Sequence, residues 1–260
     1  MSISVSPERH TALVKSLRSA GCVYAEEEAD LLLSTAQDPV DLRRMLEQRI
    51  SGLPLEQALG WASFCGLRIL VEPGVFVPRR RTEFLVRQAV DLAPTSAVIV
   101  DLCCGTGAVG AAMLRSLGEA QLYAADVDPA AVRCARRNLE VEVYQGDLFT
   151  ALPDAPRGRV DVLVANVPYV PSEEIAFLPV EAREHEPRVA LDGGPDGLDV
   201  LRRVVTEAGD WLAPGGSLLV ETSEWQEPTA VELFQGAGFR TRAVRAPDDS
   251  ATVVVGRATD

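Results

Sequence analysis

Residues 98–107 read Val-Ile-Val-Asp-Leu-Cys-Cys-Gly-Thr-Gly, an apolar run that passes into a glycine-rich loop. The run predicts a buried strand, and the small apolar residues after the loop predict a helix. Glycine lets a backbone approach a ligand closely, because it lacks a side chain and tolerates a positive φ. From this stretch alone, a purely structural turn between strand and helix remains an alternative interpretation. So does a dinucleotide site, since Gly105, Gly107 and Gly110 fit the Gly-x-Gly-x-x-Gly spacing.

The chain after Pro78 alternates between strand-like and helix-like patterns. Helical stretches such as 128–139 and 198–212 separate the apolar strand candidates, which lie at about 97–102, 121–126, 141–145, 160–165 and 217–221. This alternation predicts an α/β fold with a parallel sheet covered on both faces. Two later runs, 238–244 and 251–255, are joined only by a polar turn at 247–249. They predict an antiparallel pair at the sheet edge.

The chain before Pro78 has a different pattern. Leucines recur at helical spacing from Ser6 to about Gly60, and Ser6-Pro7 and Asp38-Pro39 each offer an N-cap followed by proline. Residues 61–71 predict two short strands about a glycine turn. The predicted organisation is a helical domain at 1–60, a β-hairpin linker at 61–78 and a cofactor-binding domain at 79–260.

Composition narrows the classes of partner. A formal charge of −13 argues against a partner held by its phosphates, so a protein or small molecule is expected rather than nucleic acid. The apolar runs are too short to span a bilayer. Residues 1–8 lack the basic residues and apolar core of a signal peptide, which predicts a cytoplasmic protein.

Metal chemistry is not expected from the histidines and cysteines. His10 and His185 have no histidine or cysteine neighbour at ligand spacing. The five cysteines are odd in number and also lack metal-ligand spacing, so we expect free thiols that pack as small apolar groups.

Three aspartates follow the predicted strands. Asp101 would place a carboxylate beside the loop, which is unfavourable next to a pyrophosphate but useful next to the ammonium group of S-adenosylmethionine. Asp126 ends the next strand, where an acid can accept hydrogen bonds from both ribose hydroxyls, while Asp128 before a proline is the better helix cap. Asp147 is placed to reach an adenine amino group, with Phe149 as a flat neighbour; a solvated turn stays open for Asp147.

The stretch Asn166-Val167-Pro168-Tyr169 follows the apolar run 160–165. Ligands bind at the carboxyl ends of parallel strands, so this stretch and the glycine loop are expected to face one cleft. The Asn166 oxygen and the Val167 carbonyl would accept the two N–H groups of a planar amide and direct its nitrogen at a methyl group. Pro168 stiffens the backbone, and Tyr169 offers a flat face. The alternative is a strand-ending turn.

An ordered set of motifs resembles the protein-(glutamine-N5) methyltransferase family that modifies peptide chain release factors, and more closely an actinobacterial-type paralogue branch. The motifs are Pro54–Gly60, Val75–Glu83, the glycine loop, Asn166–Tyr169 and Glu186–Gly194. The resemblance implies a Rossmann-like class I methyltransferase with a mostly parallel seven-stranded sheet and an antiparallel edge strand. It also implies that Phe76 and Thr82 contact the cofactor and that the N-terminal helices grip a protein substrate.

The expected catalytic residues are Asn166, Val167, Pro168 and Tyr169. The residues expected to bind S-adenosylmethionine are Phe76, Thr82, Asp101, Cys103, Gly105, Thr106, Gly107, Asp126, Val127, Asp147, Leu148 and Asn166.

Two departures from the family pattern leave the methyl acceptor open. The family usually has proline where this chain has Val167 and Arg80, and its N-terminal region is usually longer. Methylation of a small amine or amide therefore stays an alternative. Adenine methylation, a nicotinamide-dependent oxidoreductase and an inactive scaffold are the remaining alternatives.

Overall fold

The computed structural model describes residues 6–248 and 250–259, and its centre is a seven-stranded sheet of order β5-β4-β3-β6-β7-β9-β8. Residues 1–5 of the expected N-terminal segment and Asp249 of the expected turn lie outside the described residues. The strands are β3 (Val98–Leu102), β4 (Gln121–Asp126), β5 (Val143–Gln145), β6 (Val160–Ala165), β7 (Leu212–Thr222), β8 (Arg240–Arg245) and β9 (Thr252–Arg257).

The strands from β5 to β7 in this order pair in parallel, and β9 runs antiparallel to both β7 and β8. This confirms the mostly parallel sheet with an antiparallel hairpin at its edge. Strand β9 is the one that runs against the others, and it lies one position in from the edge. The chain builds β3, β4 and β5 outward in one direction and then returns to add β6 and β7 on the other side of β3.

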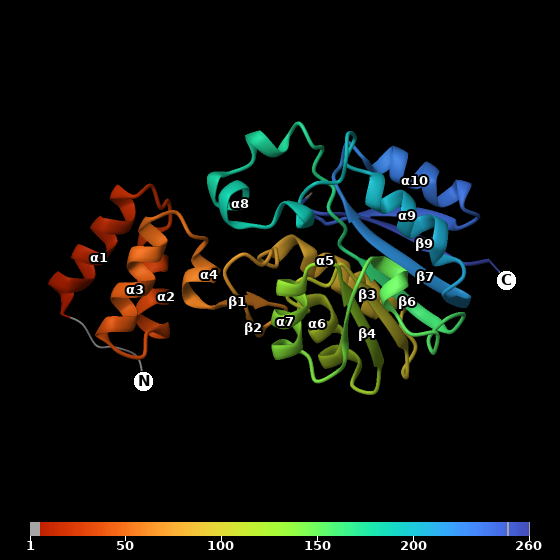
Figure 1. Cartoon of the computed structure of the whole chain (residues 1–260), viewed down its shortest axis with the longest axis horizontal. Helices are drawn as coiled ribbons and strands as arrows, with labels where there is room; N and C mark the ends of the chain where they lie inside the picture. The colour runs from red at the N-terminus through yellow and green to blue at the C-terminus, as the bar shows by residue number, and fades with distance from the viewer. Residues whose placement is uncertain (1–5, 249, 260) are drawn as a thin grey trace.

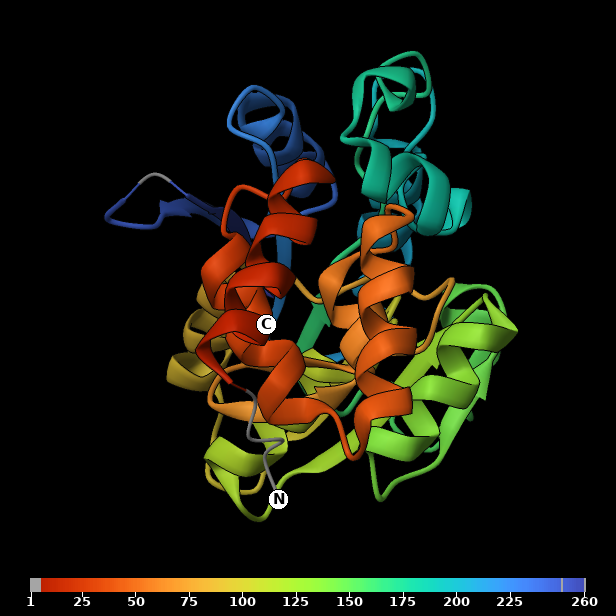
Figure 2. The same ribbon diagram turned by 90° about the vertical axis from the view of Figure 1, so that its left-hand side faces the viewer.

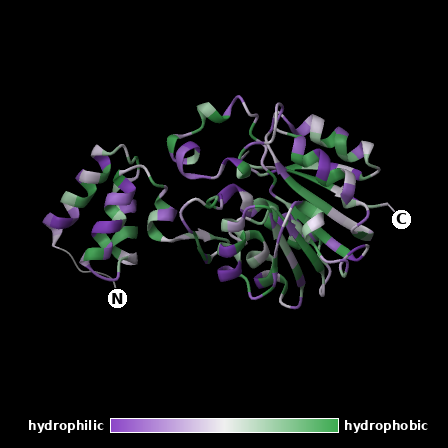
Figure 3. Ribbon diagram, in the orientation of Figure 1, coloured by the Kyte–Doolittle hydropathy of each residue, from purple (hydrophilic) through white to green (hydrophobic). Residues whose placement is uncertain are grey.

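Helices cover both faces of the sheet (Figure 1). The apolar residues of α5 (Glu83–Leu92), α6 (Ala108–Leu117) and α7 (Pro129–Asn138) pack against one face. Those of α9 (Asp199–Ala208) and α10 (Glu227–Gly236) pack against the other. Neighbouring strand residues such as Ile99 and Val100 therefore enter different cores. Figure 3 shows the result as hydrophobic strands beneath helices with hydrophilic outer faces.

The N-terminal helices are α1 (Pro7–Ser19), α2 (Ala25–Thr35), α3 (Pro39–Ile50) and the short α4 (Leu55–Leu59). They share an apolar core of their own around Leu17, Leu32 and Met45. The side chains of Ser6 and Asp38 cap α1 and α3 as expected. In Figure 1 these helices lie at the end of the long axis opposite the C-terminus, and in Figure 2 they lie in front of the sheet.

A hairpin connects the helices to the sheet. Strands β1 (Trp61–Phe64) and β2 (Leu67–Leu70) pair antiparallel. Their two-residue turn, Cys65-Gly66, has φ of 48° and 70°, as a type I′ turn requires. The expected pair of strands about a glycine turn is therefore confirmed.

Two expected boundaries differ near residue 212. Helix α9 ends at Ala208, not at 212, and β7 begins at Leu212, five residues before the expected strand. Residues Pro214, Gly215 and Gly216 resemble a turn in sequence, yet the strand continues through them. The reason is a bulge opposite β6, where the pairing register shifts between Val160 and Val162.

Within the described residues, no helix has both the length and the apolar character needed to cross a bilayer.

Candidate functional site

A cavity of about 700 Å³ lies at the carboxyl ends of β3 and β6. The strand order reverses between these two strands, because β4 lies on one side of β3 and β6 on the other. Open α/β sheets bind ligands at this kind of position. The glycine loop after β3 and the Asn166–Tyr169 loop after β6 both line the cavity, as expected from the sequence.

All the expected site residues except Gly107 line this cavity. They are Phe76, Thr82, Asp101, Cys103, Gly105, Thr106, Asp126, Val127, Asp147, Leu148, Asn166, Val167, Pro168 and Tyr169. Their position in one cavity brings the two expected sets together. Their binding roles stay predictions.

The glycine loop is held in a strained backbone conformation. Cys103 has a φ of 56°, in the left-handed region that a side chain disfavours, and Gly105 follows with 55°. The Asp126 carboxylate fixes the loop, since its Oδ2 accepts a hydrogen bond of 2.8 Å from the Gly105 N–H. Its Oδ1 accepts one of 2.9 Å from the Asp128 N–H. Burial raises the pKa of Asp126, so the carboxylate is desolvated yet hydrogen-bonded.

Asp101 is buried behind the same loop. Its Oδ2 accepts a hydrogen bond of 3.0 Å from the Gly110 N–H in the first turn of α6. Its exposed fraction is 2%, and burial raises its pKa to about 7. An isolated buried carboxylate is costly to ionise, so the group suits a cationic ligand that would stabilise its charge.

Gly107 does not line the cavity, although it was expected to bind the cofactor. It lies behind the loop, where an added Cβ would be 2.8 Å from the Leu139 side chain. Its φ of 76° also places it in the left-handed region at the start of α6. Gly107 therefore serves the packing of the loop on α7 and the entry into α6.

The expectation that Phe149 is a flat neighbour of the adenine is wrong. Its ring is buried and stacks on Trp211 in the core, with centroids 5.4 Å apart. The reason is the 3-10 turn Leu148–Ala151, in which successive side chains point about 120° apart. Leu148, with a φ of 49°, faces the cavity in its place.

Asp147 is paired rather than free. Its Oδ2 accepts a hydrogen bond of 2.6 Å from Arg203 Nη2, on α9. Both side chains are about half exposed, so the pair stabilises the fold little. It does orient the carboxylate at the wall of the cavity, because Arg203 also lines it.

Asn166 presents an unsatisfied oxygen. Its Oδ1 is buried and has no hydrogen-bond partner among the described residues. Such an atom costs about 1–3 kcal/mol unless a ligand completes it. Val167 beside it is buried against the core of the sheet, so the loop is anchored where it leaves β6.

The Tyr169 hydroxyl belongs to a small polar cluster. It donates a hydrogen bond of 3.2 Å to Glu221 Oε1 and accepts one of 2.6 Å from Arg81 Nη2. Arg81 Nε also donates to Glu221 Oε1, at 3.0 Å. Burial, together with the charge of Glu221, raises the pKa of Tyr169 to about 12, so the phenol stays neutral. The cluster fixes the ring at the cavity wall.

The segment that carries Phe76 and Thr82 forms another wall. Thr82 Oγ1 is buried without a hydrogen-bond partner among the described residues. Glu186 holds this segment from the side of the Glu186–Gly194 motif. Its carboxylate accepts a hydrogen bond from the Val77 N–H at 3.2 Å and one from Arg79 at 2.6 Å.

Glu181 and Arg203 also line the cavity, and the sequence did not point to either. Glu181, on α8 (Val180–His185), accepts a hydrogen bond of 2.6 Å from Arg49 Nη1 on α3. Arg49 is buried and also donates to Glu28 on α2, at 2.7 Å. This network links the N-terminal helices to a residue that lines the cavity. It joins residues 132 positions apart, so no local pattern indicates it.

The residues of the cavity fit S-adenosylmethionine. The buried Asp101 carboxylate suits the ammonium group, and Asp126 keeps lone pairs for the ribose hydroxyls. Two of the three buried oxygens without a partner among the described residues, Thr82 Oγ1 and Asn166 Oδ1, belong to residues that line the same cavity and offer further hydrogen-bonding positions. The strained glycine loop brings the backbone to the wall of the cavity, as close approach to a ligand requires.

Comparisons with known proteins agree with this geometry. Residues 66–181 match the Methyltransferase small domain family. A release factor glutamine methyltransferase of Mycolicibacterium smegmatis is 40% identical over 249 residues, which cover 87% of this chain and 88% of that protein. A 4-amino-L-phenylalanine/4-methylamino-L-phenylalanine methyltransferase of Streptomyces pristinaespiralis is 32% identical over 94% of this chain and 86% of that protein.

The fold is also found among solved structures. A methyltransferase from Pyrococcus furiosus superposes with a TM-score of 0.58 at 18% identity, over 75% of this chain and 90% of that one. This likeness concerns the fold alone. The sequence identity over most of both chains carries the assignment: the chain belongs to the release factor glutamine methyltransferase family, whose methyl donor is S-adenosylmethionine.

Proposed function

We propose that this protein methylates the side-chain amide nitrogen of a glutamine in a protein substrate, a peptide chain release factor. The observation that carries the proposal is the buried, unpartnered Asn166 Oδ1 at the cavity wall. An acceptor amide has two N–H groups to donate, and this oxygen needs one donor. The names of the relatives support the choice of a release factor.

The chain's residues act by holding a poor nucleophile. An amide nitrogen reacts weakly, because its lone pair is delocalised into the carbonyl group. Asn166 Oδ1 accepts one N–H and the Val167 carbonyl accepts the other, which directs the nitrogen at the position of the methyl group. S-adenosylmethionine supplies an electrophilic methyl group on a positively charged sulfur. The neutral Tyr169 ring, fixed by Arg81 and Glu221, offers a flat face beside it.

Proton removal needs no strong base in this scheme. The nitrogen becomes acidic once it is alkylated, and its proton leaves to water. The Tyr169 phenol is not a base here, since burial raises its pKa to about 12. The site acts mainly by positioning.

The N-terminal helices, which we take as a unit of residues 1–60, contribute the substrate-binding wall in this proposal. The hairpin unit 61–78 joins them to the catalytic unit 79–260. The Arg49–Glu181 ion pair supports the assignment, because it joins α3 to a residue that lines the cavity. Pro54 and Glu56, which follow α3 in sequence, also line the cavity.

The test is methyl transfer from radiolabelled S-adenosylmethionine to purified release factors, followed by mass spectrometry of the modified peptide. We expect one added methyl group on a glutamine. A release factor with that glutamine replaced by alanine is the control. The proposal would be refuted if no methyl group were transferred to any purified release factor while the enzyme rapidly methylated another acceptor.

A second candidate is N-methylation of a small aromatic amine. The relative from Streptomyces pristinaespiralis favours it, since its name gives an amino acid with an aryl amine as substrate. Val167 stands where proline is usual in the family, and this difference would also allow the loop to bind an amine in place of a glutamine amide. Incubation with 4-amino-L-phenylalanine under the same conditions separates the two candidates.

We further infer that the chain is a member of an actinobacterial-type paralogue branch. Its departures at Val167 and Arg80 support this placement. A tree of family sequences, in which chains with both departures group apart from the release factor enzymes, is the expected result.

A further inference from the structure

The Glu186–Gly194 motif is one of those that carry the family resemblance, and the proposed mechanism gives its residues no role. The segment continues into a tight glycine turn behind the acceptor loop. A Cβ added to Gly193 would be 2.7 Å from the Pro168 carbonyl oxygen. One added to Gly197 would be 2.3 Å from the Tyr169 carbonyl oxygen. Only glycine permits this approach of two backbones.

Backbone hydrogen bonds fasten this segment to the acceptor loop. The Val170 N–H donates to the Leu191 carbonyl at 3.0 Å, and the Gly193 N–H donates back to the Val170 carbonyl at 2.9 Å. The Ser172 N–H donates to the Gly194 carbonyl at 2.9 Å. Residues 186–197 thus form a brace along the residues that follow Asn166.

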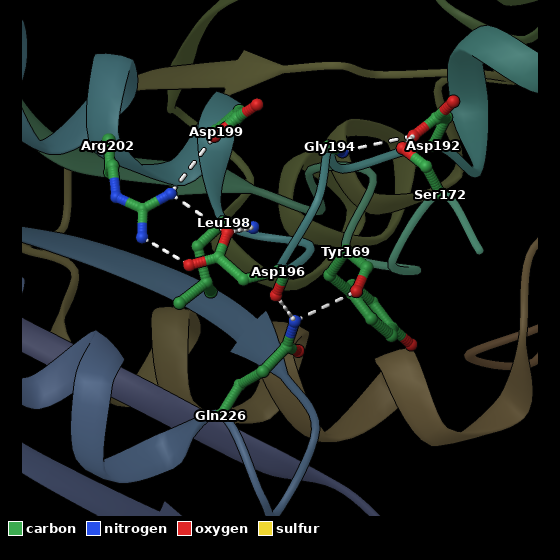
Figure 4. Close-up of polar contacts among 9 residues, drawn as sticks. All are labelled: Tyr169, Ser172, Asp192, Gly194, Asp196, Leu198, Asp199, Arg202 and Gln226. Atoms are coloured by element: carbon green, nitrogen blue, oxygen red, sulfur yellow. Dashed lines mark hydrogen bonds and ion pairs between the residues drawn. The ribbon is translucent and has the colours of Figure 1, made fainter. Parts of the chain in front are cut away.

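Gln226 joins the brace to the loop by one side chain. Its Nε2 donates to the Tyr169 carbonyl and to the Asp196 carbonyl, each at 3.0 Å (Figure 4). Its Oε1 accepts a hydrogen bond of 2.7 Å from Ser223 Oγ. The residue is 1% exposed, so water does not replace these bonds. Gln226 does not line the cavity.

The other end of the brace reaches the opposite wall of the cavity. The Glu186 side chain is completely buried and bonds to the Val77 N–H and Arg79. The brace therefore contacts both the Phe76–Thr82 segment and the Asn166–Tyr169 loop.

We propose that the brace of residues 186–197 positions the acceptor loop for methyl transfer, with Gln226 as the positioning residue that fixes the Tyr169 carbonyl. The inference rests on the proposed function, because the loop is taken to hold the methyl acceptor. Gln226 acts through Tyr169 and touches neither substrate nor cofactor. Its loss should lower turnover and leave cofactor affinity unchanged.

The experiment compares Gln226→Leu and Gln226→Glu with the same substitutions at Gln235. Gln226 is the N-cap of α10, and Gln235 is exposed in the last turn of that helix, so it controls for the effect of a substitution on the helix. We expect both Gln226 variants to lower kcat about tenfold or more, because a displaced loop misaligns the acceptor. The Kd for S-adenosylhomocysteine should stay within about twofold, since the cofactor wall is untouched.

Two further readouts distinguish positioning from general damage. Gln226→Glu should regain kcat as the pH falls, because a protonated carboxyl group again donates to one carbonyl, whereas Gln226→Leu should not. Hydrogen exchange at the amides of Val170 and Ser172, which bond to the brace, should become faster in both variants. Identical pH profiles, or unchanged exchange and kcat, would overturn the proposal. So would a parallel loss of cofactor affinity.

The exchange measurement separates this inference from the proposed function. It needs no methyl acceptor, so it reports how firmly the brace holds the acceptor loop even if the wild-type protein transfers no methyl group to a release factor. In that case the proposed function fails. Faster exchange in the Gln226 variants still supports the brace.

Discussion

The two walls of the cavity are built in different ways. The cofactor wall consists of strand ends and a glycine loop, and its carboxylates at 101 and 126 bond to N–H groups within 21 residues in sequence. The acceptor wall consists of the Asn166–Tyr169 loop, held by residues that are up to 88 positions away. Apart from the Asp147–Arg203 pair, the contacts that hold the cofactor wall are local, whereas the acceptor wall is assembled from distant segments.

This difference suggests a division of tasks. A local wall keeps its geometry whenever the strand and helix beside it form, which suits a cofactor of constant structure. An assembled wall depends on several segments, so substitutions distant from the cavity can retune it. The departures of this chain from its family, Val167 and Arg80, lie in or beside the segments that such a wall connects.

The largest expected effect is that of Asn166→Ala on the acceptor wall. The substitution removes the buried oxygen that would accept an amide N–H, so kcat should fall about 100-fold or more. The Kd for S-adenosylhomocysteine should change less than about threefold if the two walls act separately. Single-turnover transfer and titration calorimetry measure the two effects. A large loss of cofactor affinity would show that Asn166 serves both walls.

The next effect concerns Asp101 on the cofactor wall. Burial raises its pKa from 3.8 to about 7, so at pH 6 most of the cofactor-free protein carries a neutral carboxyl group. Binding of an ammonium group requires the carboxylate, so affinity for S-adenosylhomocysteine should rise about tenfold from pH 6 to pH 8. Asp101→Asn should remove this dependence. A variant that keeps it would assign the dependence to Asp126, whose pKa is also raised.

The same carboxyl group affects stability in the opposite direction. The folded protein holds its proton up to about pH 7, whereas the unfolded chain releases it near 3.8. The stabilisation is therefore complete below 3.8 and is lost as the pH rises through 7. Between these values the free energy of unfolding of the cofactor-free wild type should fall relative to that of Asp101→Asn. Thermal melts of both proteins across this range would show it.

The sequence predicted the loops of both walls, but not the distant contacts that hold the acceptor wall. Strand periodicity and glycine spacing are local, so β3, β6 and the loop ends were predicted correctly. Phe149 was misplaced because a 3-10 turn rotates each side chain out of the direction of its neighbour. Arg81, Glu181 and Gln226 gave no signal of their contacts, since each bonds to a residue at least 57 positions away.

A smaller effect is expected from Tyr169→Phe on the acceptor wall. It keeps the aromatic face but removes the hydroxyl that joins Arg81 and Glu221. One net hydrogen bond is worth about 1 kcal/mol, so kcat should fall about fivefold. If the hydroxyl works only through Arg81, then Arg81→Gln should add little to Tyr169→Phe. A double-mutant cycle on kcat measures this, and full additivity would contradict the cluster.

The smallest effect tests whether the cofactor wall extends to Thr82. Its hydroxyl is buried and unpartnered among the described residues, so Thr82→Val should stabilise the cofactor-free protein by about 1 kcal/mol. The same change should weaken S-adenosylhomocysteine binding about threefold, because the bound ligand would form a hydrogen bond with the Thr82 hydroxyl. Thr106→Val, also buried at the cavity, is the comparison. A substitution is expected to raise the free energy of unfolding and to weaken ligand binding only where the buried polar atom it removes has no partner until the ligand binds. Equal affinity in the wild type and Thr82→Val would remove Thr82 from the cofactor wall and leave its hydroxyl to the acceptor side.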